Sequence, residues 1–205
     1  MDLLETLFPG LGESKDVTVP DWPDRGEPWS ILDDSSPYGI KKQILSISGN
    51  EDGIIIDPSA RIGDGVVIEG PCYIGPNAEI RHSAYLRSGS WICEGALVGH
   101  SSEIKNSILL PGAKAPHFNY VGDSILGFGV NLGAGTKLSN VRNDRGRIFV
   151  RLRDGRKADT GVHKLGSLIG DGSQLGCNVV TNPGTLIGPN SMIVPNSTVR
   201  GFNEG

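Results

Sequence analysis

The sequence predicts an all-β fold, a parallel β-helix, and three observations point to it. An aliphatic residue returns at every sixth position from Ile56 to Leu110, and the same spacing resumes from Ile169 to Val199. The chain holds 30 Gly and 13 Pro, as many tight turns require. Only 6% of the residues are aromatic, so the core must be aliphatic. A six-residue period fits neither an amphipathic helix nor alternating strands, whereas one short strand and one turn per period build a β-helix.

Residues 1–53 show no such period. Prolines around Trp22 and Trp29 predict an extended segment. Ser36 as N-cap, with a proline in the first turn, predicts a short helix over about 38–46. We expect this segment to cap the open end of the solenoid, because terminal coils need shielding. The alternative is a docking strip for a partner, since exposed large apolar residues often mark contacts.

Residues 54–205 form the repeat domain. Nine six-residue steps run from Ile56 to Leu110, or three coils if a coil has three sides. Each aliphatic position then lies above its equivalent 18 residues earlier, so we expect Ile56 below Ile74, Ile92 and Leu110. Stacked strands lie about 4.8 Å apart. These side chains should therefore form interior ladders.

The period breaks twice. The first break is expected to be a loop over 111–125, which contains His117. The second, over 139–166, alternates apolar and polar residues on the approach to Asp154-Gly155, which predicts a protruding β-hairpin arm. A solenoid accepts insertions at its corners, and such loops are favoured places for functional sites.

Charge and cysteine usage exclude several classes of function. The net charge is −4 and the pI is about 5.5, so neither nucleic acid nor an anionic membrane is expected as a partner. No secretory signal and no apolar run of membrane-spanning length is present. The three cysteines, Cys72, Cys93 and Cys177, lie outside any metal-ligand spacing. We interpret them as reduced thiols of a cytoplasmic protein and expect no metal site.

Two signals point to chemistry. A neutral imidazole accepts a proton near pH 7, which makes His117 in the first break a candidate base, although each of the four histidines taken alone could be a surface residue. The arm carries eight Lys and Arg against three Asp over 142–164. This basic arm favours a phosphorylated ligand. A solvated hairpin whose charges keep an edge soluble explains it equally well.

Several motifs resemble a known family. Tyr120-Val-Gly-Asp123, Asn131-Leu-Gly-Ala-Gly-Thr136 and Asn140 resemble the acetyltransferase domain of bacterial glucosamine-1-phosphate N-acetyltransferase/UDP-N-acetylglucosamine pyrophosphorylase, over about 56–200. The arm is more similar to the bifunctional sugar-1-phosphate nucleotidylyltransferase/acetyltransferase of archaea and some bacteria. The resemblance implies a left-handed β-helix, a homotrimer with sites between subunits, and direct acetyl transfer from acetyl-CoA to an amino-sugar 1-phosphate, most directly glucosamine 1-phosphate.

The resemblance also implies roles for individual residues. It makes His117 the general base, which takes a proton from the sugar amine as that amine attacks the thioester of acetyl-CoA. The remaining positions that it implies are Arg87 and Lys105 for the sugar phosphate, Tyr120, Asn131 and Lys164 for the sugar, Asn140 beside the amine and thioester, and Cys177 and Pro195 for the cofactor.

The sequence departs from the family at Val141, where the bacterial enzyme has a tyrosine, and at Cys177 and Pro195. These departures leave two alternatives open. One is an acyltransferase that uses another sugar or acyl donor. The other is a non-catalytic β-helix subunit that partners a separate nucleotidylyltransferase. The glycine-rich nucleotide loop and metal-binding aspartates of a nucleotidylyltransferase have no counterpart here, so we expect no pyrophosphorylase activity.

Overall fold

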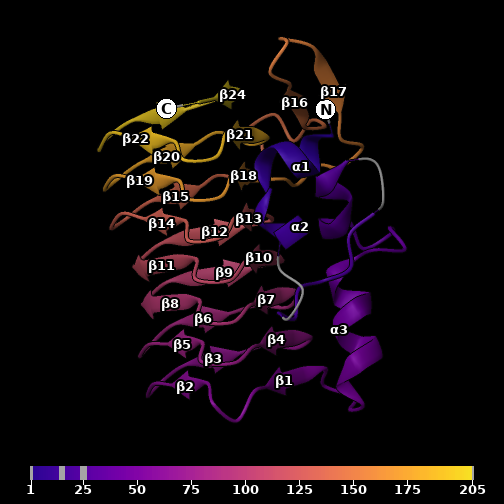
Figure 1. Ribbon diagram of the computed structural model, residues 1–205, viewed down its shortest axis with the longest axis vertical. Helices are drawn as coiled ribbons and strands as arrows, with labels where there is room; N and C mark the ends of the chain where they lie inside the picture. The colour runs from indigo at the N-terminus through magenta and orange to yellow at the C-terminus, as the bar shows by residue number, and fades with distance from the viewer. Residues whose placement is uncertain (1, 14–16, 24–26, 205) are drawn as a thin grey trace.

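The computed structural model describes residues 2–13, 17–23 and 27–204 of the 205-residue chain. Over these residues the chain is a left-handed parallel β-helix with three sides, flanked by an N-terminal segment and a hairpin arm (Figure 1). Each side is a parallel sheet of very short strands, as the six-residue period predicts. Every third strand along the chain returns to the same sheet until the arm interrupts the order.

The strands of the three sides are grouped by sheet. Sheet A contains β1 (Ile54–Ile56), β4 (Cys72–Ile74), β7 (Ser90–Ile92), β10 (Ser107–Leu109), β13 (Ile125–Leu126), β18 (Ser167–Ile169), β21 (Thr185–Ile187) and β24 (Phe202–Asn203). Sheet B contains β2 (Arg61–Ile62), β5 (Glu79–Ile80), β8 (Leu97–His100), β11 (Lys114–His117), β14 (Asn131–Leu132), β19 (Gln174–Leu175) and β22 (Met192–Ile193). Sheet C contains β3 (Val67–Ile68), β6 (Tyr85–Leu86), β9 (Glu103–Lys105), β12 (Tyr120–Gly122), β15 (Lys137–Leu138), β20 (Val180–Thr181) and β23 (Thr198–Val199).

The interior ladders follow the predicted register with one correction. Ile56 pairs with Ile74, and Ile74 with Ile92, as expected. The next rung is Leu109 and not Leu110. The coil that ends there is one residue shorter, and the shortened corner contains Asn106 in the left-handed region with φ 46°. Leu110 consequently faces outward, into a second apolar cluster.

Because of the same one-residue shift, residues 111–125 are not a separate loop. After the one-residue deletion, Ala115 and Val121 take the inward positions, at 0% exposure each. Strands β11 and β12 lie within this segment, so it continues the solenoid. A second shortened corner follows at Asp123, also with φ 46°. The sequence period is therefore shifted here while the structure stays regular.

The N-terminal segment lies along one side of the prism. Helices α1 (Leu3–Leu7), α2 (Gly10–Glu13), η1 (Pro28–Leu32) and α3 (Ile40–Ser48) cover the outer face of sheet A (Figure 1). Sheet A offers apolar side chains outward as well as inward, for example Trp91 and Ile108, and these pack with Ile44 and Trp29. The described part of this segment therefore forms a second core.

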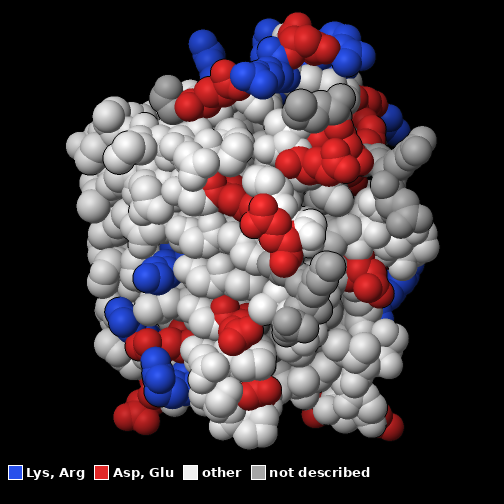
Figure 2. Space-filling view, in the orientation of Figure 1, with Lys and Arg blue, Asp and Glu red and all other residues white. Residues whose placement is uncertain are grey.

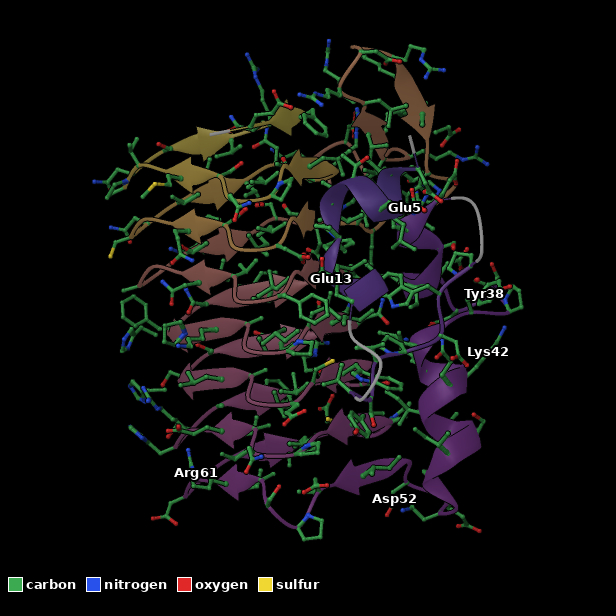
Figure 3. The ribbon with its side chains drawn as sticks, in the orientation of Figure 1. Glu5, Glu13, Tyr38, Lys42, Asp52 and Arg61 are labelled. Carbon is green, nitrogen blue, oxygen red and sulfur yellow. The ribbon has the colours of Figure 1, made fainter. Side chains whose placement is uncertain are left out.

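The open end of the first coil is not covered by the described residues. Ile56 and Ile62 remain 42% and 40% exposed. Figure 3 shows Asp52 and Arg61 at this end, whereas Tyr38 and Lys42 point away from the prism on the outer side of the N-terminal segment. Our expectation of an end cap thus differs from the position observed, because the apolar outer face of sheet A offers the larger surface to bury.

The expected helix of the N-terminal segment has a different N-cap. Helix α3 begins at Ile40 with Gly39 as N-cap and no side-chain cap, whereas Ser36, the expected cap, belongs to the preceding turn.

Asp171 connects the first helices to the solenoid, since its carboxylate accepts hydrogen bonds from Gly10 N at 2.8 Å and Phe128 N at 2.8 Å. Burial raises the pKa of Asp171.

The arm is the predicted hairpin. Strands β16 (Phe149–Arg151) and β17 (Lys157–Asp159) pair antiparallel, and Gly155 in the connecting turn has φ 84°. Val150 is fully buried against the second apolar cluster, whereas its neighbours on the strand face solvent. The alternation seen in the sequence therefore separates an anchoring face from a free face. No helix among the described residues is long and apolar enough to cross a membrane.

Close approach between coils makes one glycine indispensable. A Cβ at Gly99 would lie 1.6 Å from the carbonyl oxygen of Pro116 in the next coil. We expect Gly99→Ala to lower the free energy of unfolding by about 3 kcal/mol, the upper part of the range for overpacking. Urea unfolding measures this change. Gly12→Ala is the matched control because a Cβ there meets nothing within 4 Å; equal midpoints for the two variants would contradict the coil spacing described here.

Candidate functional site

His117 lies at the corner between sheets B and C. Its side chain is exposed, and its backbone N donates to Asn119 Oδ1 at 3.0 Å. The register partner of His117 in the preceding coil is His100, whose ring stacks on that of His82 with centroids 4.4 Å apart. Within the described residues neither ring nitrogen of His117 is hydrogen-bonded. The imidazole is therefore free to meet a ligand.

The same corner carries both residues assigned to the cofactor by resemblance. Backbone hydrogen bonds connect this corner in four successive coils. The equivalent residues, in chain order, are His117, Ala134, Cys177 and Pro195. Cys177 thus lies two coils and Pro195 three coils from His117, about 10 and 14 Å at the spacing of parallel strands. Cys177 is exposed. An extended ligand along this corner would contact all three residues.

The opposite edge of sheet C carries the two cations expected to hold a phosphate. The register of β6 and β9 sets Arg87 beside Lys105 in the next coil. Arg87 Nη1 donates to Glu103 Oε1 at 2.9 Å, and this hydrogen bond raises the pKa of Arg87. Arg87 Nε is buried without a partner. Each cation is thus held by an acid while donors remain for a ligand.

Asp123 organises this edge. Only 3% of the residue is exposed, and its carboxylate accepts from Lys105 Nζ at 2.8 and 3.0 Å and from Asn106 Nδ2 at 2.9 Å. Asn140 Nδ2 donates to the second carboxylate oxygen. Asn106, Asp123 and Asn140 occupy the same corner of three successive coils, because both intervening coils have 17 residues. The shortened corners therefore build an amide–carboxylate–amide ladder.

Tyr120 stands between the two edges, half-buried on the outer face of sheet C. Burial raises the pKa of its phenol, the charges of Glu103 and Asp123 add to this effect, and a hydrogen bond with Asn140 opposes it. The hydroxyl therefore stays neutral near pH 7 and can both donate and accept. Tyr120 is suited to orient a polar ligand that lies across sheet C.

Lys164 joins the edge that Asp123 organises. A cavity of about 410 Å³ brings Lys164 together with Lys105 and Asp123, and the N-terminal segment adds Lys41 and Asp34 to its wall. Lys41 Nζ and Asp34 form an ion pair of 2.8 Å. The second apolar cluster thus fixes a charged segment next to the candidate site, a contribution that the sequence pattern did not reveal.

Asn131 is separated from this edge. It lies on the outer face of sheet B, between Lys114 and Gln174 in the neighbouring coils. Sheet C stands between Asn131 and the edge that holds Asn140 and Lys164. A single small ligand on one chain cannot touch all three. The other predicted residues therefore lie on sheet C or at its two edges, whereas Asn131 lies on sheet B, beyond the corner that carries His117.

Sequence reasoning missed the acids of this site. Asp123 and Glu103 appeared only as parts of motifs, and neither was assigned a role. A signal for Asp123 existed in the five-residue step from Val121 to Leu126, which marks a shortened corner. No group of three or more His, Cys, Asp or Glu in the described part of the chain is arranged to hold a metal ion.

The chain is similar to several known proteins. A family model described as the GMPPB C-terminal domain matches residues 68–201. The bifunctional sugar-1-phosphate nucleotidylyltransferase/acetyltransferase of Sulfurisphaera tokodaii is 38% identical over 194 residues, covering 89% of this chain and 48% of that protein. The bifunctional protein GlmU of Methanococcus vannielii is 39% identical over 191 residues, covering 87% and 44%. The chain thus spans about half the length of these two relatives.

A relative of similar length also exists. The putative uncharacterized acetyltransferase YaiX of Escherichia coli is 33% identical over 215 residues, covering 98% of this chain and 92% of that protein. Among solved structures, the acetyltransferase domain of PglB from Neisseria gonorrhoeae matches with a TM-score of 0.39 and 16% identity, covering 80% of this chain and 59% of that one. A likeness at this level carries no weight for the function.

The ladder at Asp123 generates a testable prediction. Asp123→Ala removes the acceptor of Lys105, Asn106 and Asn140, and should lower the free energy of unfolding by about 3 kcal/mol or more, as for a broken buried ion pair. Urea unfolding measures the loss. Asp144→Ala breaks an exposed ion pair with Arg142 and should leave the value within error. A loss within error for Asp123→Ala would contradict a stabilising role of the ladder.

Proposed function

This chain belongs to the GMPPB C-terminal domain family, and we propose that it is an acetyl-CoA-dependent N-acetyltransferase acting on an amino-sugar 1-phosphate. Glucosamine 1-phosphate is the acceptor that we put first, which would place the reaction on a route toward UDP-N-acetylglucosamine. Two bifunctional relatives and YaiX carry acetyltransferase or GlmU in their names, which supports the acetyl-transfer class.

The corner between sheets B and C supports the proposal. An exposed imidazole without a hydrogen-bond partner stands at one level, and Cys177 and Pro195 follow at the same corner toward the C-terminus. A thioester on an extended carrier fits such a linear edge, with its reactive carbon next to His117. The arrangement supports a donor that runs along the prism and an acceptor that lies across sheet C.

The chemistry needs one base. Neutral His117 accepts a proton from the acceptor amine while the amine nitrogen attacks the thioester carbonyl carbon. The C–N bond forms, the C–S bond breaks, and the thiolate leaves and takes up a proton. No covalent bond to the enzyme is required, so the exposed thiol of Cys177 has no catalytic part in this scheme.

The opposite edge supports a phosphorylated acceptor. Lys105 uses donors on Asp123 and retains one, and Arg87 keeps most of its five N–H groups while bound to Glu103. These acids hold the cations in fixed positions, and phosphate prefers such charge-assisted donors. Lys164 adds a further cation in the same cavity.

We also propose that copies of the chain form a homotrimer with sites between neighbours. Asn131 and the pair Asn140–Lys164 face different directions on one prism. One ligand reaches all of them only where the His117 corner of one copy meets the sheet C–sheet A edge of the next. The tryptophans weighed as a docking strip pack inward, Trp29 with 3% exposure, so no observation favours a purely non-catalytic subunit.

The base assignment is tested by substitution. His117→Ala should lower kcat for acetyl transfer to glucosamine 1-phosphate by about 10²–10⁴-fold, the usual contribution of a general base. Thiol release from acetyl-CoA measures the rate. His82→Ala is the matched control, since it changes the same residue type at the same corner two coils away. Absence of thioester cleavage by the native protein with every hexosamine phosphate would contradict the proposal.

The assembly is tested by mass and dilution. Light scattering should give three times the 21.7 kDa of one chain. Specific activity should fall together with the trimer fraction as the protein is diluted, because closed symmetric assemblies complete their shared sites only when intact. A monomer with full specific activity at all concentrations would overturn the shared-site assignment.

A further inference from the structure

The corner that carries His117 turns in the same way in successive coils. One residue of each coil adopts the left-handed backbone region there, and strand register and backbone hydrogen bonds align these residues. Glycine tolerates this conformation, and short polar side chains offset its cost by local hydrogen bonds. In chain order the aligned residues are Gly65, Ser83, Ser101, Phe118, Gly135, Asn178 and Asn196, with φ between 38° and 70°. Among the described residues, Phe118 is the one large side chain in this series.

The backbone conformation of Phe118 is unfavourable for its residue type. A left-handed backbone brings the Cβ of an L-residue close to the following carbonyl oxygen, and a phenylalanine has no polar group to compensate. Deep burial of the ring would offset this cost, but Phe118 is 55% exposed. Bulky residues in this conformation cluster at functional sites. Packing within one chain therefore does not account for Phe118.

The ring of Phe118 reaches toward the next coil. A Cβ built at Gly135 would lie 3.0 Å from Phe118 Cε2 and 2.7 Å from Asn178 Oδ1. Because Gly135 has no side chain, the ring occupies the space above its backbone. The ring thus lies between His117, its neighbour in sequence, and the level of Cys177, two coils from His117. A donor that runs along this corner passes over the ring immediately after its thioester.

The corner beyond Phe118 is uncharged. Residues 133–136, 176–179 and 194–197 contain no Asp, Glu, Lys or Arg. Figure 2 agrees, since the left edge of the molecule is uncharged where β14, β19 and β22 end in Figure 1 and charged nearer the first coils. Val194 adds a second apolar side chain here, 69% exposed. A neutral carbon chain fits this surface, whereas a phosphate would meet no charged donor.

We propose that Phe118 is a donor-binding residue, whose ring is the surface on which the uncharged chain next to the thioester sulfur lies. Resting on the proposed function, this contact holds the thioester carbonyl carbon beside His117. The part of the donor recognised at this corner is its neutral chain and not its phosphates. Phe118 is retained for the ligand at the expense of a relaxed corner.

Calorimetric titration of the full chain with acetyl-CoA tests this inference. Phe118→Asn introduces the residue that the same corner uses at Asn178 and Asn196, so the backbone should keep its conformation. The variant should raise Kd about fivefold to tenfold, as expected when about 50 Å² of apolar contact is lost. Phe118→Tyr keeps the ring and should bind acetyl-CoA as the native protein does.

Ser83→Asn is the matched control. It introduces the same residue at the same corner, two coils before Phe118 and away from the part of the corner that leads to Cys177. Its Kd should equal the native value. The thermal unfolding midpoint of Phe118→Asn should not fall below that of the control, because relief of the left-handed strain offsets the lost contact with Gly135.

Two outcomes would overturn the inference. One is a native Kd for Phe118→Asn, which would show that the donor does not touch the ring. The other is a lower molar mass of this variant by light scattering, at a concentration where the native protein keeps its mass. That result would assign the exposed ring to a contact between copies of the chain.

The inference and the proposed function fail separately, because binding is measured without acetyl transfer. A protein that binds acetyl-CoA through Phe118 but acetylates no hexosamine phosphate supports the inference and contradicts the function. A protein that acetylates glucosamine 1-phosphate, with equal Kd for acetyl-CoA in the native form and in Phe118→Asn, supports the function and overturns the inference.

Discussion

The register of hydrogen bonds between successive coils is the constraint on which the rest of the molecule depends. Parallel pairing repeats each corner at intervals of about 4.8 Å. A residue type that recurs once per coil therefore becomes a continuous column on the surface. His82, His100 and His117 share one such column, which continues to Cys177 and Pro195. Regular spacing in the sequence thereby becomes a straight column of side chains along one edge of the solenoid.

Local departures from that register create the polar edge of sheet C that forms part of the candidate site. The corners at Asn106 and Asp123 are each one residue short, and both residues adopt left-handed backbone conformations. The shortening aligns their side chains with Asn140 and with Lys105. A buried carboxylate with several donors is stable, whereas the same group without them would be costly. The deletion that disturbs the sequence period is thus what assembles the polar edge.

Ion pairs fix the positions of several basic side chains. Arg87 and Lys105 are held by acids on the solenoid, which fixes their positions and leaves donors free. On the arm, Arg142, Arg147, Arg153 and Arg156 each pair with an acid, whereas Arg151 and Lys157 form no ion pair with any carboxylate of the described residues. Cations that are paired in this way keep a fixed geometry, as charge-assisted hydrogen bonds are short and directional.

The sequence by itself determined the β-helix, its interior ladders as far as Ile92, and the hairpin, because strand pairing and burial follow directly from periods of six and two. It also supplied His117, Lys105 and Lys164 as candidates. It could not give the one-residue shift at Asn106. Leu109 and Leu110 are both aliphatic, so the sequence pattern allows either of them to be the inward residue of that coil. Only the tertiary structure decided that residues of the N-terminal segment cover sheet A, that Asp123 accepts hydrogen bonds from Lys105, Asn106 and Asn140, and that Arg151 and Arg200 line one cavity. These are contacts between distant parts of the chain, and local patterns carry no information about which partner a side chain meets.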